Sequence, residues 1–341
     1  MNIQDAIDRV VNKRDLEGSE MQSVMREIMQ GEATPAQIGG FLVGLRMKGE
    51  TVTEIAAAAE VMRSMADKVE IDCPNLVDVV GTGGDGSHTF NISTAASFVV
   101  AAAGARVAKH GNRSASSKSG SADLLELAGA NLDLTPPQVA ECINATGIGF
   151  MFAPRHHGAM RHAIGPRREL GTRTIFNMLG PLTNPAGVKN QLVGVYAADL
   201  VRTVAEVLQR LGSEHVLVVH SEDGLDELSI AAMTGVAELK DGNLSEYRIS
   251  PEDFGLKRNS LDDIRVTSVR DSLELVNTVL DNQAGTARDI VCLNAGAAIY
   301  AAGVAETLNE GVEKAQAVIA AGTAKQKFNE FIGYTRKFIS G

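Results

Sequence analysis

The chain has 341 residues, of which 44% are hydrophobic and 22% charged, proportions typical of a globular protein large enough for two structural units. Its formal net charge of −10 argues against non-specific binding to nucleic acid. The three cysteines lack the spacing of metal ligands. No apolar run approaches the length of about 18 residues that a membrane span needs, and the first residues do not show the pattern of a signal peptide, in which basic residues precede an apolar stretch. We therefore expect reduced thiols, a cytoplasmic location and no membrane contact.

The first 70 residues are predicted to be helical throughout, with apolar residues at helical spacing in four short segments. The signals that begin the second, third and fourth helices are, in order, Ser19 with Gln22, Thr34 with Pro35, and Thr51 with Glu54. The fourth helix is expected to continue to about Val69. We therefore expect residues 1–70 to form a separate helical bundle. Its apolar stripes, which include Phe41 and Leu42, form either core or a subunit contact.

From Asp72 onward, strand and helix signals alternate, which is typical of βαβ units and a largely parallel sheet. The candidate strands are 76–80, 105–108, 148–152, 191–197 and 215–220, followed by a hairpin over 236–249. The candidate helices are 92–103, 121–129, 136–146, 199–211, 272–281, 294–303 and 307–321. We expect an α/β domain over 72–341. The alternation lapses at 156–185, which we expect to pack back on the bundle and complete it.

A glycine-rich loop at 81–86 separates the first strand from the helix at 92–103. Asn91, Ser93 or Thr94 can cap that helix. A strand, a glycine loop and a helix N-terminus together present backbone N–H groups to an anion, so we interpret the loop as a phosphate site rather than a simple tight turn. Neither the dinucleotide fingerprint nor the P-loop pattern fits its spacing.

A second unusual loop, 109–121, follows the next strand and contains three cations, five serines and two glycines. Cations and hydroxyl groups at the carboxyl end of a strand suit phosphate or pyrophosphate. The alternative is a solvated serine-rich loop. Two anion-binding loops at one sheet edge would indicate a ligand with two phosphate-bearing ends.

An acidic turn follows the strand at 215–220 and carries Asp226 and Glu227 side by side. Mg²⁺ commonly binds through one or two carboxylates together with substrate phosphates, so this pair is a candidate metal site. The alternative is a solvated acidic turn. We expect both carboxylates to be exposed at this strand end.

Basic residues gather near the middle of the chain. His156, His157 and His162 are spaced so that they do not converge on one helical face, which disfavours zinc. Arg167 and Arg168 could bind a carboxylate substrate, or simply cap and solvate a helix, and the residues alone leave both readings open.

With these stretches in hand, the sequence resembles the anthranilate phosphoribosyltransferases over essentially its whole length. The matching motifs are Gly-Thr-Gly-Gly-Asp-Gly-x-x-Thr-Phe-Asn-Ile-Ser-Thr at 81–94, Lys-His-Gly-Asn-Arg at 109–113, Arg-x-x-Leu-Gly-x-Arg-Thr-Ile-Phe-Asn-x-Leu-Gly-Pro-Leu-Thr-Asn-Pro at 167–185 and Asp-Glu-Leu-Ser at 226–229. The glycine loop alone is not specific, because the related pyrimidine nucleoside phosphorylases have a similar one. The motif at 109–113 favours the transferase.

The resemblance implies a small helical domain plus an α/β domain, and transfer of phosphoribosyl from phosphoribosyl pyrophosphate (PRPP) to anthranilate in tryptophan biosynthesis. It places around PRPP Gly81, Gly84, Asp85, Thr89, Asn91, Ile92, Ser93, Thr94, Lys109, His110, Gly111, Asn112, Arg113, Ser114, Ala115, Ser116, Ser117 and Ser121. It places around anthranilate Gly81, His110, Asn112 and Arg167, with Arg167 nearest the carboxylate. It also implies a pair of Mg²⁺ ions per subunit on Ser93, Asp226 and Glu227, and a homodimer formed through the helical domain.

No general base is expected among these residues, because an aromatic amine is already a free base at neutral pH. The chemistry needs mainly positioning and stabilisation of the leaving pyrophosphate. Two rival functions remain: a nucleoside phosphorylase, which would use phosphate, and a catalytically silent homologue that binds nucleic acid. The acidic charge and the intact loops oppose the second rival.

Overall fold

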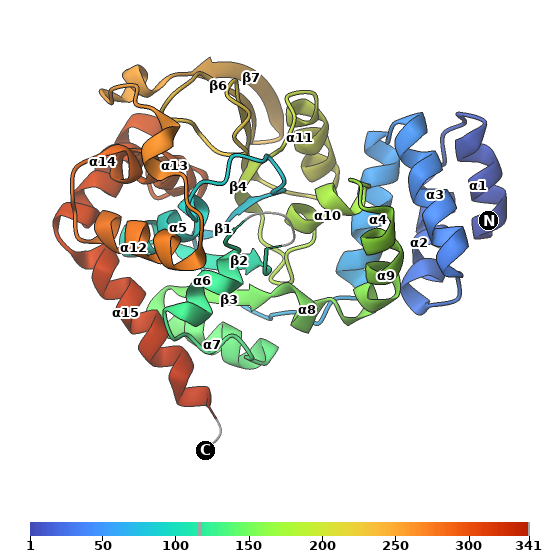
Figure 1. Cartoon of the computed structure of the whole chain (residues 1–341), viewed down its shortest axis with the longest axis horizontal. Coiled ribbons are helices and arrows are strands. Elements are labelled where there is room, and N and C mark those ends of the chain that lie inside the picture. Colours follow the sequence, from blue (N-terminus) through green and yellow to red (C-terminus); the bar gives the residue numbers. More distant parts are fainter. Residues whose placement is uncertain (115–117, 340–341) are drawn as a thin grey trace.

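A computed structural model describes residues 1–114 and 118–339 of the chain. Its N-terminal helices are α1 (Ile3–Val11), α2 (Gly18–Gln30), α3 (Pro35–Lys48) and α4 (Val52–Ser64), shown in blue in Figure 1. Thr34 and Thr51 cap α3 and α4 as predicted. The predicted cap of α2 is wrong, because Glu17 and Glu20 form its capping box, with the Glu17 N–H donating to the Glu20 carboxylate at 2.9 Å.

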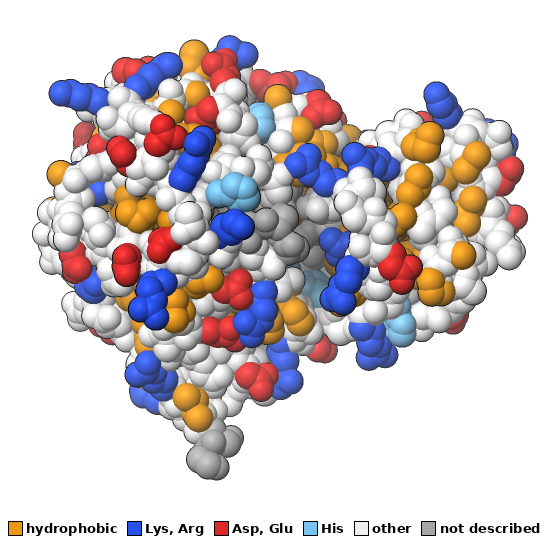
Figure 2. All heavy atoms as spheres, viewed as in Figure 1, with side chains coloured by type: hydrophobic (Ala, Val, Ile, Leu, Met, Phe, Trp, Pro, Cys, Tyr) orange, Lys and Arg blue, Asp and Glu red, His pale blue; other side chains and the backbone are white. Residues whose placement is uncertain are grey.

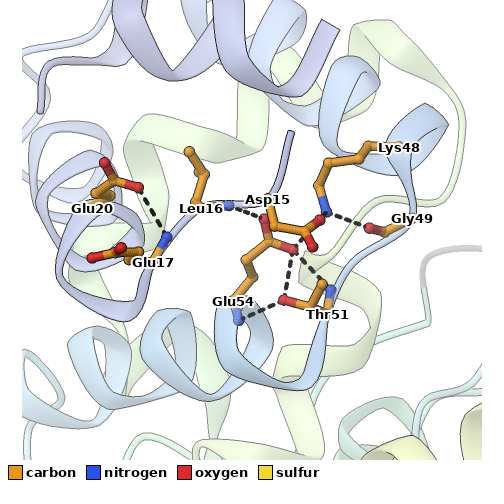
Figure 3. A network of polar contacts seen from close by, with 8 residues as sticks. All are labelled: Asp15, Leu16, Glu17, Glu20, Lys48, Gly49, Thr51 and Glu54. Carbon is orange, nitrogen blue, oxygen red and sulfur yellow. Dashed lines mark hydrogen bonds and ion pairs between the residues drawn. The ribbon is translucent and has the colours of Figure 1, made fainter. Parts of the chain in front are cut away.

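A buried ion pair joins the helices of this bundle (Figure 3). Glu54 on α4 is fully buried, and its carboxylate accepts hydrogen bonds from Lys48 Nζ at 2.9 Å, Thr51 N at 2.8 Å and Leu16 N at 2.8 Å. Lys48 also pairs with Asp15 at 2.7 Å. Each hydrogen bond to a buried carboxylate offsets part of the free-energy cost of removing that carboxylate from water. The network fixes the α1–α2 and α3–α4 connections against each other.

The helix α4 ends at Ser64, so the predicted continuation to Val69 is wrong. Beyond it, Asp67 N donates to His156 O at 2.9 Å and Val69 N to Pro185 O at 3.1 Å. These amides are satisfied by the 156–185 segment instead of by a further helical turn.

A seven-stranded sheet forms the centre of the larger unit, in the order β3-β2-β1-β4-β5-β6-β7. The strands are β1 (Leu76–Gly81), β2 (Arg106–Gly111), β3 (Ile148–Phe152), β4 (Asn190–Gly194), β5 (His215–Ser221), β6 (Thr234–Lys240) and β7 (Asn243–Ile249). The first five are parallel, and β6 and β7 add an antiparallel hairpin. The prediction of a largely parallel sheet is confirmed.

The sheet packs against α5 (Ile92–Ala102), α7 (Pro136–Thr146), α11 (Leu200–Arg210) and α13 (Thr286–Ala301). Further helices pack on these or on one another: α6 (Ser121–Leu127), α12 (Val269–Leu280), α14 (Leu308–Ala320) and α15 (Thr323–Thr335). Two differ from expectation. The helix α13 begins well before 294, and α15 was not predicted. Phe328 and Phe331 of α15 pack against Phe98 of α5, with ring centroids 4.9 and 5.6 Å away, so long-range burial holds α15 in place.

The segment after β3 forms α8 (Ala153–His156), α9 (Arg161–Leu170) and α10 (Phe176–Leu182). Of these, α9 packs on α2 and α3, and α10 packs on α4, so both lie where the two units meet (Figure 1). No helix in the described part of the chain is long and apolar enough to cross a membrane.

Candidate functional site

A cavity of about 570 Å³ opens at the carboxyl ends of the parallel strands, where α9 and α10 face the sheet. Figure 2 shows the molecule hollowed between its two lobes, with Lys, Arg and His side chains around the hollow. Among the residues predicted for a site, the cavity is lined by Gly81, Gly84, Asn91, Ser93, Lys109, His110, Gly111, Asn112, Arg113, Ser114, Ser121 and Arg167. Loops far apart in the sequence thus meet at one sheet edge, as parallel strands require.

Other predicted residues lie outside this lining: Asp85, Thr89, Ile92, Thr94, Asp226 and Glu227. The side chains of Ile92 and Thr94 are buried, and Ile92 N already donates to Phe90 O at 2.7 Å. Ala115, Ser116 and Ser117 lie outside the described residues.

The glycine loop takes a shape that only glycine adopts easily, with φ values of 64°, 77° and 77° at Gly83, Gly84 and Gly86. It is tied to the acidic turn, because Gly83 N donates to Asp226 Oδ2 at 2.7 Å. A Cβ at Gly81 would lie 2.5 Å from the same oxygen, so that position also requires a glycine.

Asn91 begins α5 without capping it through its side chain. Its amide instead donates to Ser119 O at 3.1 Å, and its Oδ1 accepts from the hydroxyl groups of Ser119 at 2.5 Å and Ser272 at 2.7 Å. The residue therefore joins the first predicted loop to the second.

Lys109 lies beneath the cavity with only 3% of its surface exposed. Its Nζ donates to Val79 O at 2.6 Å and lies 3.4 Å from Ser93 Oγ. Burial lowers the pKa of Lys109, while the nearby carboxylates of Asp78 and Glu227 oppose that change. A buried ammonium between two loops suits an anionic ligand.

Asp78 is a buried residue that supports the cavity wall through His110, and the sequence did not single it out. It is fully buried on β1, where its carboxylate accepts from His110 N at 3.2 Å and Asn184 Nδ2 at 2.7 Å. Burial raises its pKa to about 6. A lone Asp inside a β-branched strand was the available signal, since such a residue must be paired.

The acidic turn differs from expectation in one respect: Asp226 is buried, not exposed. Burial and repulsion from Asp85 raise the pKa of Asp226 to about 7. Burial and the adjacent Asp226 raise the pKa of Glu227, which Lys109 and a backbone hydrogen bond from Ser93 partly offset. Adjacent carboxylates, one buried at Asp226 and one half-buried at Glu227, that repel each other form a donor pair that suits Mg²⁺.

The rings of His110 and His157 lie against each other at the cavity wall, with centroids 5.1 Å apart and planes tilted by 55°. Burial and the neighbouring histidines lower the pKa of His110 to about 3, and burial and His156 lower that of His157 to about 4. Both rings are therefore neutral at physiological pH. His110 Nδ1 lies 3.3 Å from Gly180 O, which makes it the donor. Within the described ranges, no three His, Cys, Asp or Glu side chains gather as a metal site.

Arg167 reaches the cavity from α9, and its guanidinium lies over the ring of Phe176, 5.1 Å from the centroid. Arg173, also missed, donates to Gly84 O and lies over Tyr196 at 4.4 Å. Arg46 of the bundle donates to Arg173 O at 2.7 Å. The helical unit is thereby connected to the glycine loop.

Comparison with known proteins decides the family. The helical bundle domain of the glycosyl transferase family matches residues 4–66, and the a/b domain of that family matches residues 73–325. A Marinomonas protein named anthranilate phosphoribosyltransferase is 61% identical over 342 residues, covering 100% of this chain and 99% of the relative. This chain belongs to the anthranilate phosphoribosyltransferase family.

Further members of the anthranilate phosphoribosyltransferase family agree. A relative of that name from Methylococcus capsulatus is 59% identical over 99% of both chains. The Thermus thermophilus enzyme superimposes with a TM-score of 0.92 at 43% identity, covering 97% of this chain and 99% of its own. The Saccharomyces cerevisiae enzyme, solved in complex with PRPP and Mg, gives a TM-score of 0.90 at 25% identity over 98% of both chains. The resemblance read from the motifs is confirmed.

Proposed function

We propose that this chain transfers the phosphoribosyl group of PRPP to the amine of anthranilate, giving N-(5-phosphoribosyl)anthranilate and pyrophosphate. The observation that carries the proposal is a single cavity that brings together the glycine loop, the cationic loop and Arg167. Two of these features suit phosphates and the third suits a carboxylate. Family membership supplies the reaction.

PRPP occupies the sheet side of the cavity in this proposal. The glycine loop and the Ser93 end of α5 hold the pyrophosphate through backbone N–H groups, and Lys109 adds a positive charge. Asn91, Asn112 and Ser121 extend that set along the second loop. Anthranilate lies opposite, between His110 and Arg167, with its amine toward the ribose.

Ser93, Asp226 and Glu227 are the residues that would hold Mg²⁺, and we propose a pair of ions per subunit. When bound, Mg²⁺ neutralises the charge of the leaving pyrophosphate. The Saccharomyces cerevisiae relative was solved with PRPP and Mg. Titration with Mn²⁺ in the presence of PRPP, followed by electron paramagnetic resonance, counts the ions directly.

The residues do little covalent chemistry. The amine nitrogen bonds to C1 of the ribose while the C1–O bond to pyrophosphate breaks, and the nitrogen then loses a proton to solvent. Neutral His110 beside the acceptor keeps the amine from meeting a fixed positive charge there. Positioning and charge stabilisation account for the rate.

The test is a pair of assays on the same preparation. Loss of anthranilate fluorescence that depends on PRPP and Mg²⁺ supports the proposal. Phosphate-dependent cleavage of pyrimidine nucleosides would instead favour the phosphorylase. Failure of both reactions, with nucleic acid retained on purification, would favour the silent homologue.

We further propose a cytoplasmic homodimer joined through the helical domain. Val11 and Met47 are 64% and 76% exposed on the bundle, so the described residues leave most of these apolar side chains uncovered. Sedimentation equilibrium reports the mass in solution, and cell fractionation reports the location.

A further inference from the structure

Asn294 is the one amide side chain in an otherwise apolar stretch of α13, and it is fully buried. Its side chain both accepts a hydrogen bond from the acidic turn and donates one to it. Leu228 N donates to Asn294 Oδ1 at 3.0 Å, and Asn294 Nδ2 donates to Leu228 O at 2.9 Å. The same Nδ2 donates to Ile290 O at 2.9 Å within its own helix. Leu228 directly follows the two candidate metal carboxylates.

The other sides of the turn are equally constrained. A Cβ at Gly194 would lie 1.4 Å from Asp226 O, so the turn rests directly on the backbone of β4. Ser221 Oγ donates to Glu227 O at 2.7 Å and accepts from Ser229 N at 3.1 Å. Asn294 supplies the contact on the helix side.

We propose that Asn294 is a positioning residue, which holds the backbone after Asp226 and Glu227 so that both carboxylates are aimed at the metal before it binds. This inference rests on the proposed assignment of the metal site. Two carboxylates that repel each other need external support to stay close, since their own interaction drives them apart. Hydrogen bonds from one buried helix residue to both the N–H and the C=O of Leu228 provide that support.

The test is the affinity for Mn²⁺, measured by electron paramagnetic resonance with PRPP present, in Asn294→Ala. Support of a ligand by neighbouring hydrogen bonds is typically worth about 10–100-fold in metal affinity, and we expect a loss in that range. Hydrogen exchange of the Leu228 amide in the metal-free variant should be faster than in the parent. The Michaelis constant for anthranilate at saturating Mg²⁺ should stay unchanged.

Two controls separate the possible outcomes. Cys292→Ala removes an equally buried side chain from the same helix and should keep the parent affinity for Mn²⁺. Asp226→Asn tests the metal site itself, so an unchanged affinity there overturns the metal assignment, whereas an unchanged affinity only in Asn294→Ala overturns the present inference. If Asn294→Ala does not fold, Asn294→Leu, which has a similar size and removes both hydrogen bonds to Leu228 without adding charge, replaces it, and parent-like Mn²⁺ binding in that variant overturns the proposal.

Discussion

The guanidinium of Arg167 lies over the ring of Phe176, 5.1 Å from its centroid, and no ion pair with another described residue satisfies its charge. Burial lowers the pKa of Arg167. An arginine over an aromatic ring, half-buried beside a cavity, can direct its N–H groups to a ligand there.

This arrangement predicts that Arg167→Ala weakens anthranilate far more than PRPP. Loss of one charge-assisted pair costs about 1.5–3 kcal/mol, which corresponds to roughly ten- to a hundredfold in apparent affinity. Arg167→Lys should recover only part of the affinity for anthranilate, because an ammonium keeps the charge but cannot form two parallel hydrogen bonds to the carboxylate. Steady-state titration of each substrate measures this. A rise in the Michaelis constant for PRPP alone would move Arg167 to the phosphate side.

The metal carboxylates are tested by replacing both with neutral isosteres, Asp226→Asn together with Glu227→Gln. Turnover should fall about a hundredfold or more, the usual loss when a group that stabilises transition-state charge is removed. The asparagine can still accept from Gly83 N, so the fold should persist. In Mg²⁺-free buffer the melting temperature should equal or exceed that of the parent, because the repulsion is gone.

Glu222→Gln serves as the matched control, since Glu222 belongs to the same turn but is exposed and paired with Arg248 at 2.9 Å. It should keep parent-like turnover. Near-normal Mg²⁺-dependent activity in the double variant would contradict the assignment of Asp226 and Glu227 as Mg²⁺ ligands.

The buried histidines predict acid sensitivity. Because the folded pKa of His157 is about 4, below the ordinary 6.5, the unfolded chain binds a proton between these pH values that the folded chain does not. Stability therefore falls as the pH drops below 6.5, by about 1.4 kcal/mol at pH 5.5 for this group. Urea unfolding of His157→Gln between pH 7.5 and 5.5 should show a correspondingly shallower decline. Equal slopes in the variant and the parent would contradict the assignment of this sensitivity to His157.

The bundle stripes separate into core and surface. Phe41 and Leu42 are fully buried within one chain, so they are core and not a subunit contact. Phe41→Ala should cost about 3–5 kcal/mol of the free energy of unfolding. Met47→Lys, at a position 76% exposed, should change the free energy of unfolding by no more than about 0.5 kcal/mol. If the bundle is the interface, the same variant should sediment with the mass of a monomer. Parent-like stability of Phe41→Ala would refute the core placement.

The sequence by itself determined the class of fold and most of the loops that line the candidate site. Short continuous apolar runs and apolar residues at helical spacing reflect local burial, so β1 to β5 and most helices followed from them. The glycine loop, the cationic loop and the acidic turn were found because each follows a strand, and the carboxyl ends of parallel strands share an edge.

Only the tertiary structure decided how charge is managed within that site. Asp226 was expected to be exposed, yet it is buried, because Gly81 and Gly194 leave room for the acidic turn to pack against β1 and β4. Asp78 accepts a hydrogen bond from the backbone N–H of His110, and Asn294 accepts one from the backbone N–H of Leu228. Each contact joins two segments that are distant in the sequence. Such contacts leave no periodic trace in the sequence, because they depend on which segments the sheet order brings together.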